Sequence, residues 1–143
     1  LCGSIKNVLA LAAGMLEGLK TSQSTKAMFL TESLHDVKYL IKKLGGDGNT
    51  ILSFAGFGDI LLTCTSTNSR NFSFGKKIGE KQSKEDLDQY LKTHTVEGVY
   101  TLKSLSNLLE QERIELPIIS LIYEIVFQNA NPEQLLEFLI QKK

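Results

Sequence analysis

Apolar residues recur along this chain at spacings of three and four, which is the period of a helix with one buried face. Residues 98–111 follow this pattern, and residues 118–127 are apolar on nearly every side, as in a central helix. Between residues 24 and 44 the same spacing holds for Ala27, Leu30, Leu34, Val37, Leu40, Ile41 and Leu44. No segment shows the alternation typical of a strand. The sequence therefore predicts an all-α domain.

Local signals mark where these helices begin and end. The run Gly45-Gly46-Asp47-Gly48 ends the second helix, because glycine accepts the left-handed conformation that closes a helix. Ser83, followed by acidic residues, begins another helix. In Asn131-Pro132-Glu133 the asparagine caps the last helix and the proline occupies its first turn. Residues 2–19, rich in alanine, leucine and glycine, form the first helix.

Size and charge exclude several classes of protein. The 143 residues amount to one domain, and 16 basic residues balance 16 acidic ones, so we expect no nucleic-acid partner. No apolar run approaches the roughly 20 residues of a membrane helix, so we expect no membrane insertion. The spacing of a metal site is absent among the two cysteines and two histidines, Cys2, Cys64, His35 and His94. Two cysteines far apart in the sequence fit a reduced cytoplasmic compartment. Because the chain begins at Leu1, it reads as a piece of a longer protein.

A lysine and an asparagine stand at the head of the most apolar segment, in Gly3-Ser4-Ile5-Lys6-Asn7. From Val8 to Leu16 no side chain is charged, and small residues there allow close helix packing. Desolvation disfavours the charged form of an amine, which makes a lysine useful as a proton donor and acceptor. The alternative is that Lys6 extends its ammonium group to water from a buried helix end.

The segment Ala55-Gly56-Phe57-Gly58-Asp59 departs from plain helical patterning. Its glycines allow the backbone to approach another group closely. Asp59 precedes three aliphatic residues, so it is either a helix cap or the partner of a buried cation. Thr63 and Thr65 follow, and such hydroxyls commonly bond to a carbonyl one turn earlier.

Seven polar residues with one charge among them form the next departure, from Thr65 to Asn71. Hydroxyls, amides and the forked guanidinium of Arg70 suit a phosphate or a carboxylate. The alternative is a loop that only caps the helix predicted around residues 72–78, since serine, threonine and asparagine dominate loops for local reasons.

Taken in order, these motifs resemble one family over essentially the whole chain: Gly3-Ser4-Ile5-Lys6-Asn7, Ala55-Gly56-Phe57-Gly58-Asp59, Thr63-Cys64-Thr65, Ser69-Arg70-Asn71 and Val96-Glu97-Gly98. The chain resembles the C-terminal, substrate-binding domain of bacterial-type NAD(P)-dependent glycerol-3-phosphate dehydrogenase. The resemblance implies one helical domain over residues 1–143, of the 6-phosphogluconate-dehydrogenase-like type. In the family a nucleotide-binding Rossmann domain precedes it.

The resemblance also implies roles for individual residues. Lys6 matches the catalytic lysine, which protonates the substrate oxygen, and Asp59 matches the acid beside it. The group that grips the substrate phosphate corresponds to Ser69, Arg70 and Asn71, and Thr63 lines the substrate pocket. Arg70, Thr95 and Glu97 match positions that touch NAD or NADP. The implied substrates are dihydroxyacetone phosphate and sn-glycerol 3-phosphate. The resemblance also implies glycerophospholipid synthesis in the cytoplasm, and it is compatible with a homodimer.

Two departures from the family pattern limit what we expect. Phe72-Ser73-Phe74-Gly75 follows where the family often has further basic residues, so extra cationic contacts to cofactor phosphates are not expected there. The chain also lacks a Gly-x-Gly-x-x-Gly motif and βαβ alternation, so the isolated fragment should be inactive. The alternatives are the helical domain of a 6-phosphogluconate or β-hydroxyacid dehydrogenase, or a non-catalytic helical module that dimerises or binds a phospho-ligand.

Overall fold

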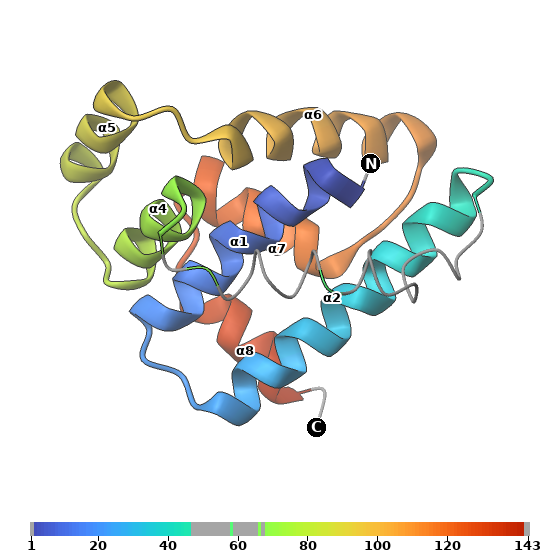
Figure 1. Ribbon diagram of the computed structural model, residues 1–143, viewed down its shortest axis with the longest axis horizontal. Helices are drawn as coiled ribbons and strands as arrows, with labels where there is room; N and C mark the ends of the chain where they lie inside the picture. Colours follow the sequence, from blue (N-terminus) through green and yellow to red (C-terminus); the bar gives the residue numbers. More distant parts are fainter. Residues whose placement is uncertain (1, 47–57, 59–65, 67, 142–143) are drawn as a thin grey trace.

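The computed structural model describes residues 2–46, 58, 66 and 68–141. Seven α-helices and no strand occur in this part of the chain, which confirms the all-α prediction (Figure 1). The helices are α1 (Cys2–Gly18), α2 (Gln23–Lys43), α4 (Arg70–Gly79), α5 (Lys84–Thr93), α6 (Glu97–Glu112), α7 (Pro117–Phe127) and α8 (Glu133–Gln141).

Helix α1 is the central element of the core. It contacts α2, α4, α6 and α7, and Figure 1 shows it in the middle of the molecule. Its side chains are buried on every side from Val8 to Ala12, where none is more than 1% exposed. This burial explains why the segment carries no charge, since an unpaired ion in such surroundings would lose its hydration without compensation. The apolar helix predicted at residues 118–127 is α7, and it contributes four buried isoleucines to the same core.

Helices α1 and α4 pack together through glycines. Gly14 and Gly18 lie one turn apart on α1, and Gly75 and Gly79 do the same on α4. A Cβ atom on Gly75 would lie 1.9 Å from the carbonyl oxygen of Leu11, and one on Gly14 would lie 2.1 Å from a carbonyl oxygen of α4. Contacts this short leave no room for any side chain. The close packing predicted from the small residues of the first helix is therefore confirmed, and α4 is its partner.

The helix boundaries follow their predicted signals. At the end of α2 the N–H of Gly45 donates to Lys42 and that of Gly46 to Ile41, with Gly45 at a φ of 88°. These two bonds form the Schellman arrangement that glycine favours. Ser83 accepts from the N–H of Asp86 at 3.1 Å and caps α5. Helix α8 begins at Glu133, one residue later than the sequence predicts, so Pro132 precedes the helix.

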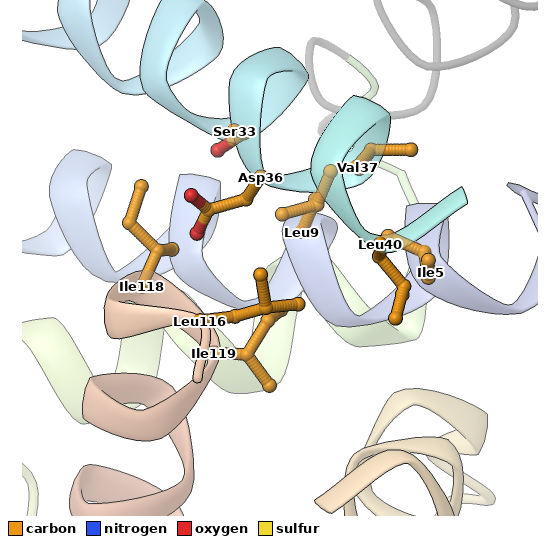
Figure 2. Close-up of a pocket in the computed structure, with 9 residues that line it drawn as sticks. All are labelled: Ile5, Leu9, Ser33, Asp36, Val37, Leu40, Leu116, Ile118 and Ile119. Carbon is orange, nitrogen blue, oxygen red and sulfur yellow. The ribbon is translucent and has the colours of Figure 1, made fainter. Parts of the chain in front are cut away.

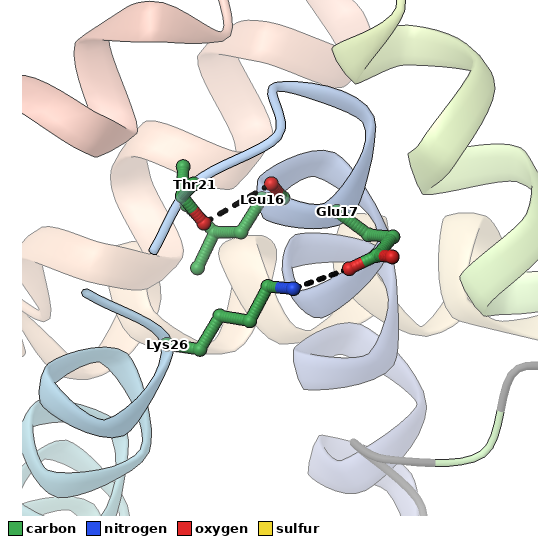
Figure 3. Close-up of polar contacts among 4 residues, drawn as sticks. All are labelled: Leu16, Glu17, Thr21 and Lys26. Carbon is green, nitrogen blue, oxygen red and sulfur yellow. Dashed lines mark hydrogen bonds and ion pairs between the residues drawn. The ribbon is translucent and has the colours of Figure 1, made fainter. Parts of the chain in front are cut away.

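Polar contacts fasten the turn between α1 and α2 (Figure 3). The hydroxyl of Thr21 donates to the carbonyl oxygen of Leu16 at 3.1 Å, and Lys26 forms an ion pair with Glu17. The hydrogen bond from Lys26 lowers the pKa of Glu17 despite some desolvation. Because the Glu17 side chain is 41% exposed, the pair stabilises the turn only modestly.

A small apolar cavity lies between α2, α1 and the start of α7 (Figure 2). Its volume is about 10 Å³, enough for about one water molecule. Ser33 faces it, and the buried Ser33 hydroxyl has no hydrogen-bond partner within the described ranges. A cavity of this size cannot hold a metabolite, so the functional site must lie elsewhere.

Candidate functional site

Three of the predicted motifs meet near the N-terminal ends of α1, α4 and α6. Gly98, at the start of α6, is the point of contact. Its N–H donates to the side-chain oxygen of Asn71 in α4 at 2.8 Å. A Cβ atom on Gly98 would lie 2.8 Å from the carbonyl oxygen of Asn7 in α1. The Lys-Asn, Ser-Arg-Asn and Val-Glu-Gly motifs are therefore neighbours in space, although long stretches of sequence separate them.

At the start of α4, Ser69 is the cap of the helix. Its hydroxyl oxygen accepts from the N–H of Phe72 at 2.9 Å, as the capping alternative predicts. A hydroxyl that accepts in this way can still donate its own hydrogen to an anion. Arg70 follows as the first residue of α4 and is exposed, and it forms no ion pair with any other described residue. A helix start with an available guanidinium group favours a bound anion.

Lys6 lies in the second turn of α1 and is half-buried. The residue before it, Ile5, is 1% exposed, and the charge-free core segment begins two residues later at Val8. The predicted environment, an amine at the edge of a buried apolar helix, is therefore confirmed. The same environment suits both interpretations of Lys6, proton transfer and extension to water, and its chemical role stays a prediction.

Two of the predicted residues, Asp59 and Thr63, lie outside the described residues. The roles expected for them, as the acid beside the lysine and as a hydroxyl of the substrate pocket, therefore stay predictions.

Thr95 and Glu97 flank the turn that leads into α6, and both are exposed. Between them Val96 is 1% exposed, so it anchors this turn in the core. The Thr95 hydroxyl can donate and accept hydrogen bonds, and the Glu97 carboxylate can accept them. The contact of these residues with NAD or NADP, which the resemblance implies, stays a prediction.

The aromatic residues that replace basic ones after the Ser-Arg-Asn motif have a structural role. Phe72 is 6% exposed and Phe74 is 3% exposed, and the ring of Phe74 stacks on Tyr90 of α5 at 5.9 Å between centroids. These side chains therefore pack inside the protein.

Comparison with known proteins identifies the family. A family model described as the NAD-dependent glycerol-3-phosphate dehydrogenase C-terminus matches residues 1–137. The chain belongs to this family. It is 39% identical over 128 residues to glycerol-3-phosphate dehydrogenase (NAD(P)+) of Staphylococcus epidermidis, covering 90% of this chain and 38% of that protein. With the Staphylococcus aureus enzyme it shares 36% identity over 142 residues, covering 98% of this chain and 42% of that protein.

A solved structure agrees with the family assignment. The crystal structure of glycerol-3-phosphate dehydrogenase from Coxiella burnetii superimposes with a TM-score of 0.87 at 34% identity, covering 97% of this chain and 42% of that chain. Both the resemblance and the helical C-terminal fold of glycerol-3-phosphate dehydrogenase are thus confirmed. The chain spans about two fifths of the length of the relatives it matches.

The family name indicates an NAD(P)-dependent enzyme. None of the described helices is long and apolar enough to cross a bilayer. Within residues 2–46, 58, 66 and 68–141, no three histidine, cysteine, aspartate or glutamate side chains group closely enough to hold a metal ion.

Sequence reasoning missed the structural part of this site. Asn71 is predicted to bind substrate, but its side-chain oxygen bonds to the backbone of α6. Gly98 is part of a predicted motif, and the structure shows that the motif needs a glycine because α1 and α4 leave no space for a side chain. A glycine in the first turn of a predicted helix, where it weakens the helix, is the signal that could have indicated this contact.

Proposed function

We propose that this chain is the substrate-binding half of a glycerol-3-phosphate dehydrogenase that interconverts dihydroxyacetone phosphate and sn-glycerol 3-phosphate. The observation that carries this proposal is the meeting of the α1, α4 and α6 starts at Gly98 in a chain of this family. It brings the predicted lysine, phosphate and cofactor motifs into one neighbourhood. We further propose that residues 1–143 act as a single domain.

The phosphate of the substrate binds at the start of α4. Arg70 offers a planar pair of N–H donors that matches two phosphate oxygens, and the Ser69 hydroxyl and the Asn71 amide add donors beside it. The positive end of the α4 dipole favours the dianion further. Held at this end, the substrate can present its carbonyl carbon in a fixed orientation.

Lys6 transfers the proton. Reduction of the carbonyl group places negative charge on its oxygen, and a nearby ammonium group stabilises this charge and donates a proton to form the hydroxyl. In the reverse direction the neutral amine takes the hydroxyl proton. Asp59 orients the ammonium group and Thr63 lines the pocket, as the resemblance implies.

The cofactor, NAD or NADP, supplies the hydride when bound. On this chain Arg70, Thr95 and Glu97 contact it, and a Rossmann domain outside these 143 residues holds most of it. The isolated chain is therefore inactive. The full protein works in the cytoplasm in glycerophospholipid synthesis and is compatible with a homodimer. The family match favours this function over a 6-phosphogluconate or β-hydroxyacid dehydrogenase and over a non-catalytic module.

The contact between Arg70 and the phosphate is tested by Arg70→Lys in the full-length enzyme. An ammonium group cannot reproduce the forked pair of bonds. Loss of one charge-assisted hydrogen bond should raise the KM for dihydroxyacetone phosphate ~10- to 100-fold, from a bond strength of about 1.5–3 kcal/mol. The matched control is Arg113→Lys at the far end of α6, which should leave the KM unchanged. An unchanged KM in Arg70→Lys would show that Arg70 does not bind the phosphate.

A further inference from the structure

Helix α6 lacks a cap from its own sequence. Its N-cap residue, Val96, makes no side-chain hydrogen bond, although the first N–H groups of a helix need partners outside it. The partner comes from α4, where the Asn71 oxygen accepts from the N–H of Gly98 at 2.8 Å. Gly98 is the second residue of α6, the position to which an ordinary N-cap side chain binds. Asn71 thus caps α6 from 27 residues away in sequence.

This bond fixes the orientation of the Asn71 amide. A backbone N–H can only donate, so the atom facing Gly98 must be the amide oxygen. The amide nitrogen then lies on the other side of the group, away from the Gly98 N–H. Toward a ligand, the amide nitrogen can act only as a donor, so the ligand atom that it meets is an acceptor.

The residues around this bond are closely packed. Asn71 is 8% exposed, and a Cβ atom on Gly98 would lie 2.8 Å from the Asn71 oxygen. The same Cβ atom would lie 3.1 Å from a side-chain carbon of Leu11 in α1. The start of α6 therefore sits directly against the α1 backbone at Asn7 and against the Asn71 side chain of α4. The bond therefore ties the backbone beside Thr95 and Glu97 to the start of α4, which carries Arg70.

We propose that Asn71, besides donating to the substrate phosphate as in the proposed function, is a positioning residue: through its bond to Gly98 it ties the Thr95–Glu97 turn to the phosphate-binding start of α4. This role rests on the proposed function. It extends that function, because one side chain then links the substrate side of the site to the cofactor side.

Two substitutions in the full-length enzyme separate the two halves of this role. Asn71→Asp keeps an oxygen for the Gly98 N–H, and a carboxylate at the start of α6 is favoured by the helix dipole. It loses the amide donors and adds a negative charge. Asn71→Ala loses both the acceptor and the donors. Asn107→Ala, on the exposed face of α6, is the matched control.

Hydrogen exchange of the peptide spanning residues 96–99, measured by mass spectrometry, reports the cap without requiring activity. We expect Asn71→Ala to exchange at least ~10-fold faster there, the factor that corresponds to about 1.4 kcal/mol of local protection. Asn71→Asp and Asn107→Ala should exchange like the wild type. A wild-type exchange rate in Asn71→Ala, or fast exchange in Asn71→Asp, would overturn the positioning role, whether or not the enzyme uses the proposed substrate.

Steady-state kinetics then test the link to the site. Both Asn71 variants should raise the KM for the phosphorylated substrate, but only Asn71→Ala should also raise the KM for the nicotinamide cofactor. Equal cofactor KM values in the two variants would contradict the proposal. If Asn71→Ala fails to fold, Asn71→Asp decides alone, because fast exchange of residues 96–99 in that variant overturns the role. Absence of dehydrogenase activity in the wild type would reject the proposed function and leave the exchange result standing.

Discussion

Gly75→Ala should lower the free energy of unfolding of this chain by at least about 3 kcal/mol, at the upper end of the usual cost of overpacking. In the middle of an ordinary helix the same change stabilises by about 1 kcal/mol, because alanine has the higher helix propensity. Here the new Cβ atom would lie 1.9 Å from the Leu11 carbonyl oxygen and 2.8 Å from its carbonyl carbon. These are backbone atoms of the central helix, so α4 must move away from α1 to make room.

Urea denaturation followed by circular dichroism at 222 nm measures this effect. Ser73→Ala is the matched control, since it introduces the same residue in the same helix at a half-buried position beside Lys76 and Tyr90. We expect it to change stability by no more than about 0.5 kcal/mol, as is usual away from the core. Equal stability of the two variants would show that α1 and α4 are not in backbone contact. Because α4 carries the phosphate-binding residues, Gly75→Ala should also disturb the site.

Lys6→Met should reduce turnover of the full-length enzyme by ~100- to 10,000-fold, the usual contribution of general acid–base catalysis. Methionine has nearly the length of lysine and is apolar, so it should preserve packing at the edge of the α1 core. The half-buried position of Lys6 suits this exchange. The KM for the cofactor should stay close to the wild-type value, because the predicted cofactor contacts lie on α4, on α6 and in the turn before α6.

The measurement is kcat at saturating dihydroxyacetone phosphate and cofactor. Lys103→Met, at an exposed position of α6, is the control for loss of a lysine and should retain full turnover. If Lys6→Met also retains full turnover, Lys6 is not the acid–base group, and its extension to water from a buried helix end becomes the correct interpretation.

The helices could be predicted because their signals are local. The spacing of apolar residues identifies α2 and α6, and the glycines after residue 44 end α2 through bonds to residues three to five positions back. The small residues of α1 predict close packing, but they do not name the partner. That partner is α4, because glycines far apart in the sequence match one another, and no local pattern contains this information.

The sequence predicts which residues belong to the candidate site, but it does not predict how they are arranged in space. Ser69 shows why two alternatives stayed open in the sequence: its hydroxyl caps α4, and the same geometry leaves it able to bind a phosphate. The capping of α6 by Asn71 joins two helices across 27 residues, so it becomes visible only when the fold is known. Asp59 and Thr63 lie outside the described residues, and their roles rest on the resemblance.

The most direct test of the proposed activity is reduction of NAD+ or NADP+ by the full-length protein with three substrates in parallel: sn-glycerol 3-phosphate, 6-phosphogluconate and a β-hydroxyacid. Absorbance at 340 nm follows the reduced cofactor. Our account predicts turnover with sn-glycerol 3-phosphate and none above background with the other two. Turnover with 6-phosphogluconate or the β-hydroxyacid, and none with sn-glycerol 3-phosphate, would contradict it.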